Sequence, residues 1–150
     1  MFTPHQQLDK RLSALRPLVA AAKPHRGWVR AIRETLGMTT RQLAERMGIS
    51  QPTLTRLEQS EAAGTITLSS LERAAQALGC RLVYALVPLK PLSETVEDRA
   101  LALAEEQLAS VEQTMRLEAQ GVNDPKQRKA ARRQLADDLM RRPARLWDER

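Results

Sequence analysis

Three side chains in one short stretch have the hydrogen-bonding groups needed to read DNA bases. Gln51, Thr55 and Arg56 lie within TRQLAERMGISQPTLTRLEQ, residues 40–59. Arginine can form two hydrogen bonds to guanine, glutamine can form two to adenine, and a threonine methyl group can pack on thymine. Pro52 lies beside them near the start of the same segment. We therefore predict that Gln51, Pro52, Thr55 and Arg56 contact base edges.

A first short helix must precede these residues and support them. Leu43, Ala44 and Met47 fall at positions i, i+1 and i+4, which places a narrow apolar stripe on one helix face. Gly48 follows, at a position where a helix commonly ends in a left-handed backbone conformation. The pattern predicts a helix that ends in a sharp corner at Gly48.

A second helix then carries the base-reading residues. The Ser50 hydroxyl can cap its start, and Pro52 fits its first turn, where no backbone N–H is required. Leu54 and Leu57 supply the buried side, so the polar side chains are left on the opposite face.

The starts of both helices also suit DNA phosphates, because exposed N–H groups and hydroxyls there attract anions. Either Thr39 or Thr40 can cap the first helix. The residues that we predict to contact phosphates are Thr40, Arg41, Ser50, Thr53 and Gln59.

This spacing is the helix-turn-helix pattern, and it resembles the lambda-repressor-like (XRE) DNA-binding family. The resemblance implies a mainly α fold with a five-helix domain. The second helix of the helix-turn-helix, which carries Gln51 and Arg56, would insert into the major groove. The alternative reading is an αα-hairpin whose outer face is merely polar.

Composition supports a helical protein and argues against several other classes. The chain has 150 residues, 3% aromatic content and a net charge of +6, which suits a polyanionic partner. Cys80 is the single cysteine, so an intrachain disulfide or a cysteine metal cluster is excluded. His5 and His25 lack partners at ligand spacing. We expect no metal and no cofactor.

The same survey argues against an enzyme and against a membrane protein. The sequence has no Gly-rich phosphate loop and no convincing pair of nucleophile and base. It also has no apolar run long enough to span a bilayer and no signal peptide. We therefore expect a cytoplasmic, non-catalytic protein.

Three regions follow from the order of patterns along the chain. Residues 1–25 predict a helical arm, with Leu8, Leu12, Leu15 and Val19 on one stripe. This arm could pack on the core, pair with a second copy or hold a partner. Residues 26–89 predict the helix-turn-helix domain with a terminal strand, and residues 90–150 predict a helical C-terminal extension.

The terminal strand is predicted from the run LVYALV, residues 82–87. A lone strand cannot satisfy its own backbone, and we find no second strand in the sequence. We therefore predict that residues 81–87 pair across a homodimer through Leu82, Tyr84 and Leu86, which would also present two reading helices to a palindromic operator. The alternatives are an edge strand covered by the N-terminal arm and an extended loop.

The C-terminal extension contains an acidic helix followed by a basic one. Its first apolar positions fit an a/d heptad pattern, at Leu101, Ala104, Leu108, Val111 and Met115. Residues 93–120 carry a net charge of −5 and residues 121–150 a net charge of +4. The acidic segment follows a basic reading segment, residues 26–60 with a net charge of +3, which suggests two kinds of partner. Asp124 and Pro125 fit the start of the basic helix, which we expect to be a solvated face rather than a second DNA contact. Trp147 could tuck onto the core or a partner.

Three longer stretches narrow the resemblance. GWVRAIRETLGMTTRQLA, GTITLSSLERAAQALGCRLVYALVP and LMRRPARLWD are similar to the "mobile mystery protein A" group of XRE regulators. The group is typically encoded beside a Fic/DOC-domain protein. The resemblance therefore implies an antitoxin that represses the shared operon and inhibits a Fic-type toxin by direct binding.

The same resemblance implies an inhibitory pair in the C-terminal extension. Inhibitory helices of Fic enzymes carry a Ser/Thr-x-x-x-Glu-Gly/Asn motif whose glutamate keeps ATP from docking productively. Thr114 and Glu118 match that motif, although Ala119 stands where Gly or Asn is expected.

The functional alternative is a protein-interaction module whose helix-turn-helix is only a scaffold.

Overall fold

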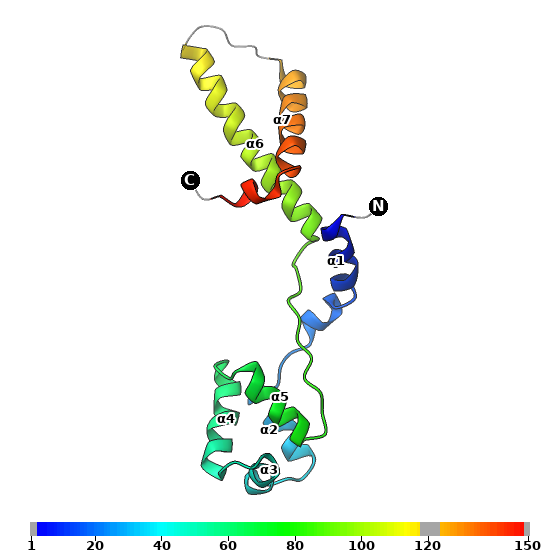
Figure 1. Ribbon diagram of the computed structural model, residues 1–150, viewed down its shortest axis with the longest axis vertical. Coiled ribbons are helices and arrows are strands. Elements are labelled where there is room, and N and C mark those ends of the chain that lie inside the picture. The colour runs from blue at the N-terminus through cyan, green and yellow to red at the C-terminus, as the bar shows by residue number, and fades with distance from the viewer. Residues whose placement is uncertain (1–2, 118–123, 149–150) are drawn as a thin grey trace. The chain divides into compact units, whose positions relative to one another are not determined.

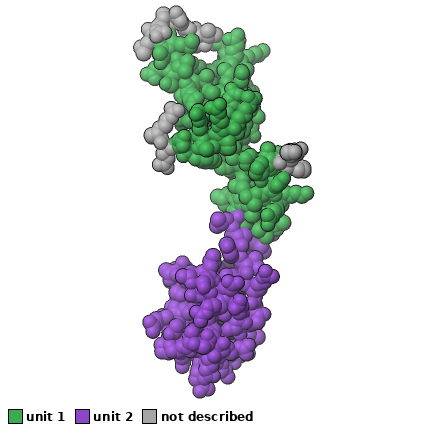
Figure 2. Space-filling view, viewed as in Figure 1, with its two compact units in different colours: residues 1–16, 87–150 green, residues 17–86 purple. Residues whose placement is uncertain are grey.

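The computed structural model describes residues 3–117 and 124–148, and it is mainly helical (Figure 1). Two compact units divide the chain: residues 17–86 form one, and residues 1–16 together with 87–150 form the other (Figure 2). The α-helices are α1 Pro4–Ser13, α2 Trp28–Thr35, α3 Thr40–Met47, α4 Gln51–Ala63, α5 Leu68–Ala77, α6 Leu92–Leu117 and α7 Pro125–Met140. Two 3-10 helices are η1 Arg16–Ala20 and η2 Pro143–Trp147.

The helix-turn-helix unit is built from four α-helices, α2 to α5, rather than the predicted five. Its core contains one or two apolar side chains from each helix. The buried members are Val29, Leu43, Ala44, Leu54, Ala74 and Leu78. A fifth helix is missing because the chain leaves α5 through Gly79 and continues without regular structure as far as Val87.

The predicted β-strand is wrong: no strand occurs in residues 3–117 or 124–148, and residues 81–87 are extended but unpaired. Leu82, Tyr84 and Leu86 therefore form no sheet. The physical reason is that a strand needs a neighbouring strand to pair with its backbone N–H and C=O groups, and this segment has none among the described residues. Tyr84 and Leu86 are 71% and 88% exposed.

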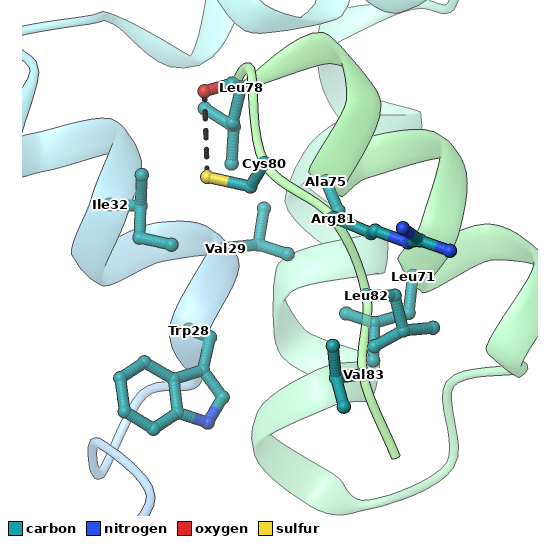
Figure 3. Close-up of a pocket in the computed structure, with 10 residues that line it drawn as sticks. All are labelled: Trp28, Val29, Ile32, Leu71, Ala75, Leu78, Cys80, Arg81, Leu82 and Val83. Atoms are coloured by element: carbon teal, nitrogen blue, oxygen red, sulfur yellow. Dashed lines mark hydrogen bonds between the residues drawn. The ribbon is translucent and has the colours of Figure 1, made fainter.

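This extended segment instead closes one side of an apolar groove of about 270 Å³. In Figure 3, Trp28 and Ile32 of α2 lie on one side of this space, and Leu82 and Val83 of the segment lie on the other. The Cys80 thiol lies at one end, where it donates a weak hydrogen bond to the Leu78 carbonyl at 3.6 Å. The apolar run of residues 82–87 thus contributes to the wall of a groove and does not form a sheet.

The second unit is centred on an antiparallel pair of helices, α6 and α7, that lie side by side (Figure 1). Its buried side chains are Ala100, Leu103, Ala104, Ala136 and Leu146. Of the predicted heptad positions on α6, Ala104 is buried, whereas Val111 and Met115 are 53% and 39% exposed. Small alanines on both helices allow close approach at Ala104, so the packed seam lies toward the start of α6.

The 3-10 helix η2 covers this core with Leu146 instead of the expected Trp147. Leu146 is fully buried, and Trp147 is 54% exposed. The Arg99 guanidinium on α6 donates a hydrogen bond to the Leu146 carbonyl at 2.7 Å, which fixes the turn.

Opposite charges on α6 and α7 pair with one another. Arg128 donates to Glu112 at 2.7 Å and to Glu105 at 3.2 Å, and Arg133 pairs with Glu97. Hydrogen bonds to Glu105 and Glu112 raise the pKa of Arg128, and the bond from Arg128 lowers the pKa of Glu105. Because the side chains are partly exposed, these pairs add little to stability. Part of the charge of the acidic segment is therefore balanced within the chain.

Helix α1, the first part of the predicted N-terminal arm, packs on α6 of the C-terminal extension, a contact that the sequence did not predict. Leu12 and Leu15 are half-buried, and α1 is followed by η1 near Pro17. Asp9 of α1 accepts hydrogen bonds from the backbone N–H groups of Leu92 at 2.6 Å and Ser93 at 3.0 Å. Asp9 thus caps α6 from a distant part of the chain.

Asp9→Ala should destabilise this unit in a pH-dependent way. The Ser93 N–H holds the pKa of Asp9 below its usual value of 3.8, with Leu92 adding to the effect. The stabilisation is therefore present above that value and is lost as pH falls through the lower folded-state pKa. Thermal unfolding followed by circular dichroism should show a lower midpoint for Asp9→Ala near neutral pH and a shrinking difference in acid. Asp148→Ala is the control, and a gap that does not change with pH would contradict the cap.

Candidate nucleic-acid interface

The α3–α4 corner forms as its local sequence predicts. Thr39 caps α3, accepting from the Gln42 N–H at 3.1 Å while the Gln42 side chain accepts from the Thr39 N–H at 2.8 Å. Gly48 has φ of 68°, a left-handed conformation that side-chain-bearing residues adopt at a cost. Ser50 then caps α4 by accepting from the Thr53 N–H at 3.3 Å. Thr39, and not Thr40, is therefore the cap of α3.

The two faces of α4 differ sharply in exposure. Leu54 is fully buried, and two carboxylates on the same side, Glu58 and Glu61, are 7% and 4% exposed. The four residues predicted to read bases, Gln51, Pro52, Thr55 and Arg56, are all exposed. Their assignment to base edges stays a prediction, but the helix presents them together on its outer face.

Two of these side chains are already oriented by hydrogen bonds. The Gln51 amide donates to the Thr40 hydroxyl at 2.9 Å, which links the starts of α4 and α3. The Thr55 hydroxyl donates to the Gln51 carbonyl at 3.1 Å, so its methyl group remains available for apolar contact. Arg56 forms no ion pair with any residue that the structure describes.

The predicted phosphate contacts lie at the starts of α3 and α4 and farther along α4. Arg41 has a side chain that is 72% exposed, with Glu45 at 3.9 Å. The hydroxyls of Ser50 and Thr53 bond to each other at 2.7 Å. Gln59 is exposed two turns farther along α4 and is the most distant of the set from the corner. The Gln51–Thr40 bond brings the two helix starts together, which concentrates their N-terminal partial positive charge.

Sequence reasoning missed the buried ion pair that holds α4. Arg33 of α2 donates to Glu58 through Nε at 2.6 Å and through a terminal nitrogen at 3.2 Å. A further guanidinium N–H donates to the Met38 carbonyl at 2.9 Å. The bond to Glu58 raises the pKa of Arg33. The two residues are 25 positions apart, so no local pattern connects them.

Glu61 makes a second connection between α4 and α2. Its carboxylate accepts from the backbone N–H groups of Trp28 and of Val29, the latter at 3.1 Å, and so caps the start of α2. Gly27 has φ of 89°, and a Cβ there would lie 2.7 Å from the Glu61 carboxylate. Helix α4 continues beyond the helix-turn-helix pattern to Ala63, and its last turn carries Glu61 to this contact.

Comparison with known proteins agrees with this geometry. Residues 29–84 match the family model described as "Helix-turn-helix". No curated protein and no solved structure matches the chain. The matched segment spans α2 to α5 and includes the corner and the exposed face of α4, so the chain contains an XRE-like helix-turn-helix domain, which supports a DNA-binding regulator. Within residues 3–117 and 124–148, no helix is long and apolar enough to cross a bilayer.

Arg33→Met should destabilise the domain strongly, because it leaves the Glu58 carboxylate buried without its partner. We expect the free energy of unfolding, measured with urea, to fall by about 3–5 kcal/mol. Arg30→Met is a matched control, since Arg30 pairs with Glu34 on the exposed side of the same helix. That control should cost only about 0–1 kcal/mol. Equal losses in both variants would show that Arg33 does not clamp α4.

Proposed function

We propose that the chain is a sequence-specific transcriptional repressor that inserts α4 into the major groove of its operator. The observation that carries this proposal is the exposed row of Gln51, Thr55 and Arg56, opposite the buried Leu54, Glu58 and Glu61. These three side chains offer the donors, acceptors and methyl group that base edges require. Occupying an operator that overlaps a promoter would block transcription.

Affinity and selectivity would come from different residues. Arg41 and the hydroxyls and N–H groups at the starts of α3 and α4 would meet phosphates, which fixes the position of the domain on the duplex. Gln51 would meet its base already held by Thr40, so less side-chain freedom is lost on binding. Arg56 forms no ion pair with the described residues, so none of those pairs must break before it meets a guanine.

Arg56→Ala should weaken binding to the operator by about 1–3 kcal/mol and relax base choice at one position. Binding to duplex DNA from upstream of the gene, and to variants of it, can be followed by fluorescence anisotropy. Arg73→Ala on α5 removes the same charge from another exposed position and should change affinity little. Equal loss on operator and scrambled DNA would refute base reading, and no binding by the intact protein would favour the scaffold alternative.

We also infer that two copies act together on a palindromic operator. Support comes from the segment after α5, where Val83, Tyr84 and Leu86 are 77%, 71% and 88% exposed. Adjacent exposed apolar side chains of this size favour association. Two copies would present two α4 helices to half-sites about one DNA turn apart.

Tyr84→Ser combined with Leu86→Ser should therefore shift the protein toward a monomer in sedimentation velocity experiments. The control is Leu18→Ser with Val19→Ser, which removes two exposed apolar side chains from η1. Sedimentation of the unmodified protein as a monomer at every concentration would contradict the dimer.

The antitoxin role is proposed on the resemblance alone. Thr114 is exposed on α6 and donates its hydroxyl to the Ser110 carbonyl at 3.1 Å. Glu118, the predicted inhibitory carboxylate, lies outside the described residues. Co-purification with the product of the adjacent gene tests the role, and a neighbour without a Fic domain would remove it while leaving DNA binding intact.

A further inference from the structure

We propose that η2 and the end of α7 bind an acidic, apolar segment of a protein partner, with Arg142 and Arg145 pairing with its carboxylates. The site is separate from α4 and does not depend on DNA binding. It lies in a groove of about 360 Å³ lined by Leu135, Asp138, Leu139, Arg141, Arg142 and Arg145. We call this the η2 groove.

The groove combines an apolar surface with exposed positive charge. Leu135 and Leu139 are partly buried and pack against the core of the unit, so their remaining surface faces the groove. Arg142 and Arg145 are exposed beside them. A ligand that fills this space must offer apolar atoms to the leucines and negative charge to the arginines.

The positive charge at Arg142 and Arg145 is not neutralised within the described chain. Other arginines of α7 have acidic partners: Arg128 pairs with Glu105, and Arg133 with Glu97. The acidic lining residue, Asp138, is engaged by Arg141 at 3.2 Å. Arg142 and Arg145 form no ion pair with any residue of 3–117 or 124–148. The groove thus has two uncompensated guanidinium groups over an apolar floor.

The backbone that carries these arginines is held in place before any partner arrives. Leu146 is fully buried, its carbonyl accepts from Arg99 at 2.7 Å, and Pro143 restricts the first turn of η2. The Arg145 N–H donates to the Arg142 carbonyl at 3.1 Å. A prearranged backbone reduces the entropy lost on binding.

The residue types agree with a protein interface. Trp147, at the end of η2, is 54% exposed. Arginine and tryptophan are among the residues that most often dominate the binding energy of protein interfaces. A guanidinium also fits a carboxylate with two parallel hydrogen bonds.

A nucleic acid fits the η2 groove less well. The C-terminal end of α7 places partial negative charge beside the arginines, which opposes a continuous row of phosphates. A phosphate backbone also has no apolar group to cover Leu135 and Leu139. A peptide with a few carboxylates next to leucine-like side chains satisfies both requirements.

The test uses the full chain and a display library of random short peptides as the probe. Selected peptides should carry at least two Asp or Glu residues near an apolar one. In fluorescence anisotropy, Arg142→Glu with Arg145→Glu should weaken the selected peptide by about tenfold or more, a change of roughly 1.4 kcal/mol. The milder Arg142→Gln with Arg145→Gln should weaken it in the same direction. The control, Lys126→Glu with Lys129→Glu at the start of α7, removes two exposed cations elsewhere and should leave binding within about twofold.

Several outcomes would overturn this site. Selection of peptides without acidic residues would do so, as would equal binding by the glutamine variant while its circular dichroism spectrum matches that of the unmodified protein. Loss of duplex DNA binding in that variant, with no peptide selected, would assign the groove to nucleic acid. Because the variants should retain full operator affinity, failure of the peptide site would be distinguishable from failure of α4 as a DNA reader.

Discussion

The buried polar face of α4 is the constraint on which the DNA-facing surface depends. Glu58 and Glu61 lie on the same side as Leu54, and both are engaged by α2, one by the Arg33 guanidinium and one by backbone N–H groups. A rotation of α4 about its axis would leave these carboxylates buried without partners, at a cost of several kcal/mol. An apolar contact alone tolerates small rotations, whereas a two-bond pair with a guanidinium does not. The outward direction of Gln51 and Arg56 is therefore set by what lies behind them.

The structural features that could be predicted from sequence are those that residues close together in the chain determine. Gly48, Ser50 and Thr67 each fix a helix end through their own backbone or hydroxyl, and Asp124 caps α7 in the same way. The core positions also follow from helical spacing, since Leu43 and Leu54 lie where the period requires. These features need no knowledge of the rest of the chain.

What could not be predicted depends on distant pairs. Glu58 and Glu61 look like solvent-facing residues because charged side chains are rarely buried unless paired, and their partners lie 25 and 32 positions earlier. Residues 82–87 have β-favouring composition, but composition supplies no second strand. The cap of α6 by Asp9 joins residues 83 positions apart, so no local pattern predicts it.

The distribution of paired charge, rather than the net charge of +6, separates the two surfaces that are open to partners. Most cations on α7 face carboxylates on α6, so a large part of the basic C-terminal segment is balanced internally. Arg56, Arg142 and Arg145 are among the guanidiniums that form no ion pair with the described residues, and their surroundings differ. Arg56 lies among hydroxyls, an amide and two positive helix starts, an environment that favours a polyanion. Arg142 and Arg145 lie beside leucines and the negative end of α7, where isolated carboxylates with apolar neighbours bind better. The same side chain is thus directed to different ligands by its nearest neighbours.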